Sequence, residues 1–299
     1  AGPRTFVVTD DMVRGLAGLR GEWKGFSWES ALTYSAARTD DETRNLISNT
    51  LFQQALARST PDAYNPFNGG SQSNFSLGDG TPSNAATIES FLVDANRIGR
   101  TSLATLDVKL SSADIFALPA GGLGFAAGAE VRRETFEDDR DARLDGTITY
   151  RDVVSGITYG TDLMGASAAP DVRAHRTVSS AFVEFALPVV SDAMDVPLVK
   201  SLDFQLAARD EYYSDFGNVL KAKLAGAWGV VDALKIRASW SQSFRAPNLA
   251  QFYSAGTQVS NTRTDFAACR LNGTTCAGAS TLEVRAGNQE LLPENAYTV

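Results

Sequence analysis

Runs in which apolar and polar residues alternate recur along this sequence and restrict what it can fold into. Residues 202–209 place Leu202, Phe204, Leu206 and Ala208 on one side and Asp203, Gln205, Ala207 and Arg209 on the other. Successive side chains of a β-strand point to opposite faces, so this pattern predicts strands with one apolar and one polar face. The same pattern recurs near residues 27–34, 221–228 and 235–241, and long runs with helical spacing are nearly absent.

Strand positions and link lengths together predict the architecture. We expect strands near residues 4–21, 26–40, 100–118, 123–137, 175–190, 201–214, 219–230 and 234–245. Short turns at Glu22–Gly25, Pro119–Gly122, Ser191–Lys200 and Val231–Ala233 alternate with long polar segments at 41–99, 138–174 and 246–290; the short link at 214–218 is an exception. A soluble sandwich also alternates, but long strands joined by tight turns at one end and large loops at the other are typical of an antiparallel transmembrane β-barrel.

One helix is expected in the first long loop. Between Asn45 and Arg58, apolar residues recur with helical spacing. We predict a short surface helix folded over the mouth of the barrel, with a helix of a separate small domain as the alternative.

Composition and motifs exclude several classes of function. The net charge is −8 and cations are scattered among acids, which argues against binding nucleic acid. No apolar run is long enough for a spanning helix, and residues 1–30 do not resemble a signal peptide. No nucleophile elbow, Cys/His pair or phosphate loop is found, so we expect no catalytic residues, no cofactor and no enzyme.

Two features could in principle suggest a metal site. Glu137, Asp138, Asp139, Asp141 and Asp145 form an acidic run, but its spacing matches no known calcium loop, and a solvated loop is favoured. His175 is the single histidine and has no paired ligand, so we place it at the rim or in the lumen and expect no metal ligands.

The only two cysteines, Cys269 and Cys276, lie seven residues apart in a stretch rich in small residues. We predict a disulfide that pins a loop, which implies an oxidising compartment. The alternative is two unrelated small residues.

Spaced motifs carry a family resemblance. Residues 239–253 contain Phe244, Arg245, Ala246, Pro247 and Asn248 in succession, and residues 287–294 read Gly-Asn-Gln-Glu-Leu-Leu-Pro-Glu after one long loop. Both segments resemble late-barrel signatures of TonB-dependent outer-membrane receptors, and residues 118–134 and 180–188 resemble the family more loosely. Gln289 stands where the family usually has proline.

The resemblance implies that residues 1–299 form a partial all-β barrel domain, with about eight or nine of the roughly 22 strands of a plugged transporter. The plug domain and its TonB-contacting segment (the TonB box) are not found in the sequence. The intact protein is expected to come from a Gram-negative bacterium and to lie in the outer membrane, in contact with its lipid. It would import a scarce solute, such as a siderophore, cobalamin or other metal complex, or an oligosaccharide. The energy would come from the TonB system through the missing plug. The alternatives are a passive porin-like channel and a soluble secreted β-rich adhesin or lectin.

We interpret the motif residues as structural, with substrate binding by Arg245 as the alternative. Pro247 removes a ladder donor where a strand ends, and Asn248 can bond its own backbone in a turn. Asn288, Pro293 and Glu294 would shape the chain where the next strand begins. The residues that bind the solute cannot be named from the sequence, and we expect them in the long loops and the adjoining lumen.

Overall fold

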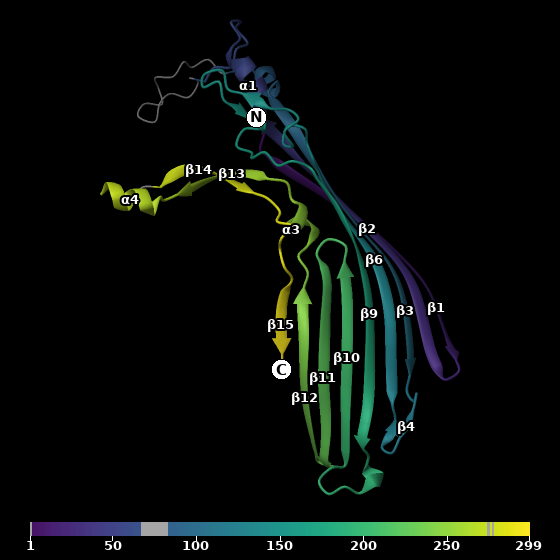
Figure 1. Cartoon of the computed structure of the whole chain (residues 1–299). Helices are drawn as coiled ribbons and strands as arrows, with labels where there is room; N and C mark the ends of the chain where they lie inside the picture. Colours follow the sequence, from purple (N-terminus) through teal and green to yellow (C-terminus); the bar gives the residue numbers. More distant parts are fainter. Residues whose placement is uncertain (1, 67–82, 274–275, 277) are drawn as a thin grey trace.

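The fold is built on one curved antiparallel sheet of nine strands, which follow chain order from one edge to the other and do not close on themselves (Figure 1). The computed structural model describes residues 2–66, 83–273, 276 and 278–299. The strands are β1 (Thr5–Trp23), β2 (Phe26–Ile47), β3 (Leu92–Ser112), β6 (Gly124–Arg140), β9 (Val172–Val190), β10 (Ser201–Tyr213), β11 (Gly217–Val231), β12 (Leu234–Arg245) and β15 (Glu294–Thr298). The predicted fold class, part of an antiparallel barrel, is confirmed.

The links carry smaller elements, with long loops at one end of the sheet and short turns at the other (Figure 1). These elements are α1 (Asn49–Leu56), α2 (Ala85–Glu89), β4 (Ala117–Leu118), β5 (Gly121–Gly122), β7 (Tyr150–Arg151), β8 (Thr158–Tyr159), η1 (Asp192–Met194), α3 (Leu249–Tyr253), β13 (Thr257–Arg263), α4 (Phe266–Asn272) and β14 (Ala279–Arg285). Within the described part of the chain, no helix has the length and apolarity needed to cross a membrane.

Several predicted bounds are wrong at the loop end of the sheet. The strand predicted to end at residue 40 continues to Ile47, where Leu46 and Ile47 pair with Val93 and Leu92 of β3. The expected helix from Asn45 therefore starts only at Asn49, with the Ser48 side chain accepting from the Leu51 N–H as its N-cap. Sheet pairing and burial of Leu46 against Ala95 and Leu163 override the local helical spacing.

The acidic run is also placed differently from the prediction. Its first three members lie in β6, which continues to Arg140, and are not in a solvated loop. Asp138 is buried and accepts hydrogen bonds from Arg97 at 2.7 Å and from Arg140 at 2.8 Å. The strand can continue past its predicted end at residue 137 because Arg97 and Arg140 pair with Asp138. A buried carboxylate is stable only when it is paired.

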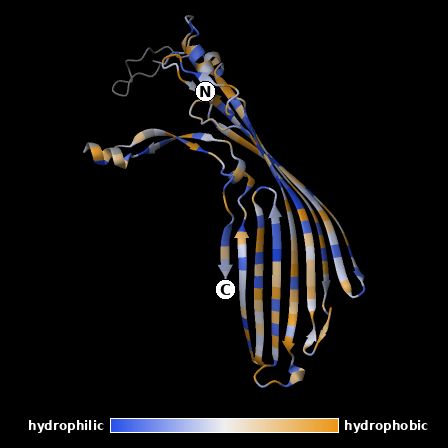
Figure 2. Ribbon diagram, in the orientation of Figure 1, coloured by the Kyte–Doolittle hydropathy of each residue, from blue (hydrophilic) through white to orange (hydrophobic). Residues whose placement is uncertain are grey.

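Apolar and polar residues alternate along the long strands (Figure 2), and this alternation gives the sheet two chemically distinct faces. The register places Leu206 opposite Leu224 and Leu224 opposite Trp240, whereas Lys223 lies between Ala207 and Ser241 on the other face. The apolar face carries side chains that are 43% to 57% exposed on six strands, namely Leu32, Leu106, Val131, Leu206, Leu224 and Ile236. A continuous exposed apolar face of this extent suits contact with lipid.

At the loop end, Asp162 holds two loops together. Its side chain is buried and accepts from Ser48 Oγ at 2.5 Å and from the Thr50 N–H at 2.8 Å, and it forms an ion pair with Arg143. Burial opposes ionisation of this carboxyl, yet the hydrogen bonds from Ser48 and Thr50 and the charge of Arg143 together lower its pKa below the ordinary value. The N-terminus of α1 is thereby fixed to the loop that follows β6.

We predict that Leu206→Arg, on the apolar face, destabilises the full-length receptor in a bilayer by about 2 to 4 kcal/mol, since a cation at mid-wall would face lipid. Ala207→Arg, on the polar face beside Glu184, is the matched control and is expected to change stability little. Denaturant unfolding in lipid vesicles measures both. An equal cost for the two variants would contradict the assignment of the faces.

We also predict an acid-sensitive contact between the two loops. Folding lowers the pKa of Asp162, so its carboxylate stabilises the contact between the two loops fully above about pH 4. This stabilisation is lost as the pH falls through the folded-state pKa. Amides of Asn49–Leu56 should therefore exchange faster in acid, after correction for intrinsic rates, in hydrogen-exchange measurements on the full-length receptor. Asp162→Asn should exchange faster at neutral pH and lack the acid transition. Identical pH profiles for the two proteins would rule out this role.

Candidate functional site

The helix α3 lies over the polar face near the loop end of the sheet, where it contacts β6 and β9 (Figure 1). Asn248 starts this helix: its Oδ1 accepts from the Gln251 N–H at 2.8 Å, and Gln251 Oε1 accepts from the Asn248 N–H at 2.8 Å. This reciprocal capping box fixes the direction in which the chain leaves β12. The sequence had suggested a turn at Asn248, and Gln251 three residues later is the signal for a helix.

The two family-like motifs meet at the base of the long loop. Phe244 pairs with Asn295 and Arg245 with Glu294 where β12 and β15 lie side by side. The Arg245 and Glu294 side chains approach to 3.8 Å, but both are exposed, so their ion pair contributes little to stability. The backbone pairing of β12 with β15 contributes more than this ion pair, because it holds the two ends of the long loop together.

Two backbone hydrogen bonds complete this closure. The Asn288 N–H donates to the Gln251 carbonyl at 2.9 Å, and the Gly287 N–H donates to the Ser254 carbonyl at 2.7 Å. A Cβ atom at Gly287 would lie 2.6 Å from the Phe252 carbonyl oxygen, so only glycine permits this approach. Pro293 precedes the first residue of β15.

Arg176 of β9 connects the wall to α3. It is buried, its Nη1 donates to the Pro247 carbonyl at 2.7 Å, and its Nε donates to Glu134 at 2.7 Å. Its guanidinium also lies 5.1 Å from the centre of the Tyr213 ring. A buried arginine held by a carboxylate and an aromatic face has few alternative positions, so it fixes Pro247 relative to the sheet.

A second arginine extends this cluster within the wall. Arg132 of β6 donates to Glu130 at 2.9 Å, to Glu134 at 3.0 Å and to the Tyr213 hydroxyl at 3.0 Å, and it lies 3.3 Å from Glu211. Tyr213 in turn donates to Glu211 at 2.8 Å. We call Arg132, Arg176, Glu130, Glu134, Glu211 and Tyr213 the wall cluster.

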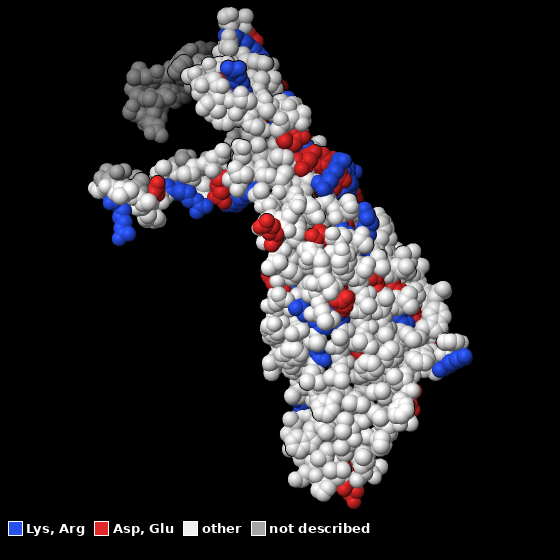
Figure 3. All heavy atoms as spheres, viewed as in Figure 1, with Lys and Arg blue, Asp and Glu red and all other residues white. Residues whose placement is uncertain are grey.

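The wall cluster was not among the sites predicted from the sequence. Its signal is present, since Glu130, Arg132 and Glu134 alternate along one face of a strand in a segment that resembles the family. The partners Arg176 and Glu211 come from strands far along the chain, and no local pattern relates them. Figure 3 shows that charged side chains crowd toward the loop end of the strands in that view, whereas the lower part of the visible face carries few.

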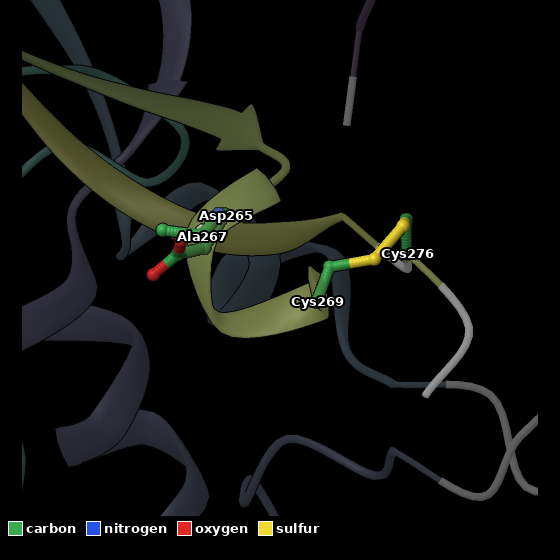
Figure 4. Close-up of a disulfide and its surroundings, with 4 residues drawn as sticks. All are labelled: Asp265, Ala267, Cys269 and Cys276. Carbon is green, nitrogen blue, oxygen red and sulfur yellow. Dashed lines mark hydrogen bonds between the residues drawn. A yellow bond between two sulfur atoms is a disulfide. The ribbon is translucent and has the colours of Figure 1, made fainter. Parts of the chain in front are cut away.

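Cys269 of α4 and Cys276 are joined by a disulfide, with their Cα atoms 5.3 Å apart (Figure 4). It lies at the end of the hairpin formed by β13 and β14. The cysteines thus lie in the same long loop as the two motifs but at its outer part, and not at its base (Figure 1). Among the described residues, no group of three or more His, Cys, Asp or Glu side chains is arranged to hold a metal ion.

A long-stranded, two-faced antiparallel sheet with large loops at one end defines part of the wall of an outer-membrane β-barrel. A family model described as "TonB dependent receptor-like, beta-barrel" matches residues 5–299, and the chain belongs to this family. Its place is the outer membrane.

Two solved structures of larger proteins are similar to this chain. A chain of the RagAB peptide transporter is 14% identical, with a TM-score of 0.50, and the match covers 98% of this chain and 28% of that chain. The siderophore receptor PirA from Acinetobacter baumannii is 18% identical, with a TM-score of 0.46 and coverage of 97% and 32%. The chain therefore spans less than a third of either matched chain. None of the curated proteins compared with it matches.

We predict that Arg176→Ala releases α3 from the wall. Loss of the bond to Pro247, with Glu134 left partly unpaired, should cost about 1.5 to 3 kcal/mol in local stability, seen as faster hydrogen exchange at residues 248–253 of the full-length receptor. Arg173→Ala, on the same strand but with a 73% exposed side chain, is the control and should leave that exchange unchanged. Equal exchange in both variants would show that Arg176 does not hold α3.

Proposed function

We propose that the complete protein imports a solute across the outer membrane and takes the energy for this step from TonB. The observation that carries the proposal is the match of residues 5–299 to the TonB-dependent receptor barrel family, supported by the two-faced sheet. The wall formed by residues 1–299 would close with further strands into a barrel of roughly 22, around a plug domain that contacts TonB.

Within this proposal the barrel strands are the scaffold and the long loops recognise the solute. Binding residues concentrate on loops held by a rigid frame, and two loops here carry structure of their own, α1 in one and the disulfide-linked β13–β14 hairpin in the other. The motif residues Phe244, Arg245, Pro247, Asn248, Asn288, Pro293 and Glu294 set the geometry of the loop base, because their contacts are with one another, α3 and the wall.

The solute class is open among siderophores, cobalamin, oligosaccharides and other metal complexes. These differ in size and chemistry, while a shared wall accommodates many cargoes. A passive channel would use the same wall without an energy source, so dependence on TonB separates the two functions.

The test uses the source bacterium with this receptor deleted, with TonB deleted, and with both deleted. We expect the receptor deletion to slow growth when iron as a siderophore complex, cobalamin or an oligosaccharide is limiting, in one of the three conditions. The double deletion should then grow no more slowly than the TonB deletion alone, since both act on one route. If deletion of the receptor slows growth by the same amount in cells that lack TonB as in cells that have it, the passive channel is favoured.

A further inference from the structure

Strands β11 and β12 differ in charge from the rest of the chain. Lys221, Lys223, Lys235, Arg237 and Arg245 lie in these two strands, and neither strand contains an Asp or Glu. The whole chain has 35 acids against 27 Lys and Arg. A region with cations alone is therefore a local departure from the overall negative charge.

Four of these cations, Lys221, Lys223, Lys235 and Arg237, share the polar face. Lys223 pairs with Ala207 on one side and Ser241 on the other, while Arg237 pairs with Ala227 and Lys235 with Gly229. From Lys221 to the level of Gly229 is eight residues, or about 27 Å at the usual rise of a strand. We call Lys221, Lys223, Lys235 and Arg237 the cationic stripe; it runs along most of the wall.

Most of the stripe lacks a neutralising partner. Lys221 donates to Asn295 at 2.6 Å and lies 5.8 Å from the centre of the Phe244 ring. Lys223, Lys235 and Arg237 are exposed, and within the described residues no carboxylate lies within 4.0 Å of their charged nitrogens. Arginines of the wall cluster, in contrast, are each paired with at least one acid on the same face.

Acids on the neighbouring strands lie near the stripe but do not pair with its cations. Glu184 binds the Gln205 side chain, and Glu211 is shared between Arg132 and Arg209. Asp203 is at the level of Arg237 but two strands away, about 10 Å across the sheet. None of these acids forms an ion pair with a cation of the stripe.

Two shallow hollows follow the stripe. The upper one, of about 500 Å³, is lined by Glu184, Arg209, Lys221 and Lys223 among others, and the lower one, of about 460 Å³, by Asp203, Gln205 and Arg237 among others. Each has the size of a site for a small molecule or for one unit of a larger solute.

We propose that the cationic stripe binds the anionic groups of the transported solute, so that the cargo carries carboxylate, phosphate or sulfate charge. The inference rests on the proposed transport function, because it places the stripe in the solute path. Unpaired cations beside low-dielectric walls concentrate anions and repel cations. Binding sites spaced along the wall would pass an anionic solute from the loop end toward the turn end.

The test measures the local field in the full-length receptor with single introduced cysteines. Ser241→Cys lies beside Lys223, and Thr33→Cys lies on the same face between Leu16 and Thr105, away from the stripe. The native cysteines are in a disulfide and do not compete. Each variant is treated with anionic and cationic thiosulfonate reagents of matched size, with and without citrate as a competing anion.

We expect the anionic reagent to modify Ser241→Cys about tenfold faster than the cationic one, and Thr33→Cys with little preference. Citrate should slow modification at Ser241→Cys, and glucose should not. Adding Lys223→Gln and Arg237→Gln should remove both effects while the receptor still folds, as judged by unchanged rates at Thr33→Cys.

Equal rates for the two reagents at Ser241→Cys, or modification of Thr33→Cys alone, would overturn the proposal. In the first case the field is not positive, and in the second the stripe is covered. Neither measurement requires transport, so either result leaves the proposed function standing. If growth on every limiting solute were independent of TonB while the labelling preference held, the transport proposal alone would fail.

Discussion

Satisfaction of the backbone hydrogen bonds is the constraint on which the rest of this structure depends. In the hydrocarbon of a membrane no water is present to pair with N–H and C=O groups, so strands must pair with one another. The continuous antiparallel ladder from β1 to β15 does this and fixes the register of each strand against its neighbours. Once the register is fixed, the face of the sheet on which each side chain lies is fixed too. One face is then apolar, and the other carries the charged side chains of the wall cluster and the cationic stripe.

The polar face then carries two kinds of charge arrangement. In the wall cluster, acids and arginines from the three strands β6, β9 and β10 neutralise one another around Tyr213, and Arg176 also donates to the Pro247 carbonyl. In the cationic stripe, the lysines and the arginine form no ion pair with a carboxylate of the described residues. The first arrangement is suited to holding a loop in place, whereas the second is suited to attracting a mobile charge.

The loops gain order by the same means as the wall, through contacts between segments distant in sequence. Asp162 connects the loop after β6 to the N-terminus of α1, and the base of the last long loop is closed by Asn288 and Gly287 on α3. Loops held at their base can vary toward their outer ends without disturbing the sheet. Under the proposed function, the motifs at the base would set the geometry of the loop, and the outer parts of the loop would contact the cargo.

The sequence by itself determined the strands, their two faces, the alternation of short and long links and the proximity of Cys269 and Cys276. These features depend on residues close together along the chain, where a period of two or a spacing of seven is visible. Tertiary structure decided where β2 ends and β3 begins, because Leu46 is buried by Leu163 from another loop. It also decided how the wall cluster holds the chain before α3, since Arg176 and Pro247 lie 71 residues apart in the sequence. Such contacts follow from the order in which strands pair and the curvature of the sheet, and no local pattern encodes either one.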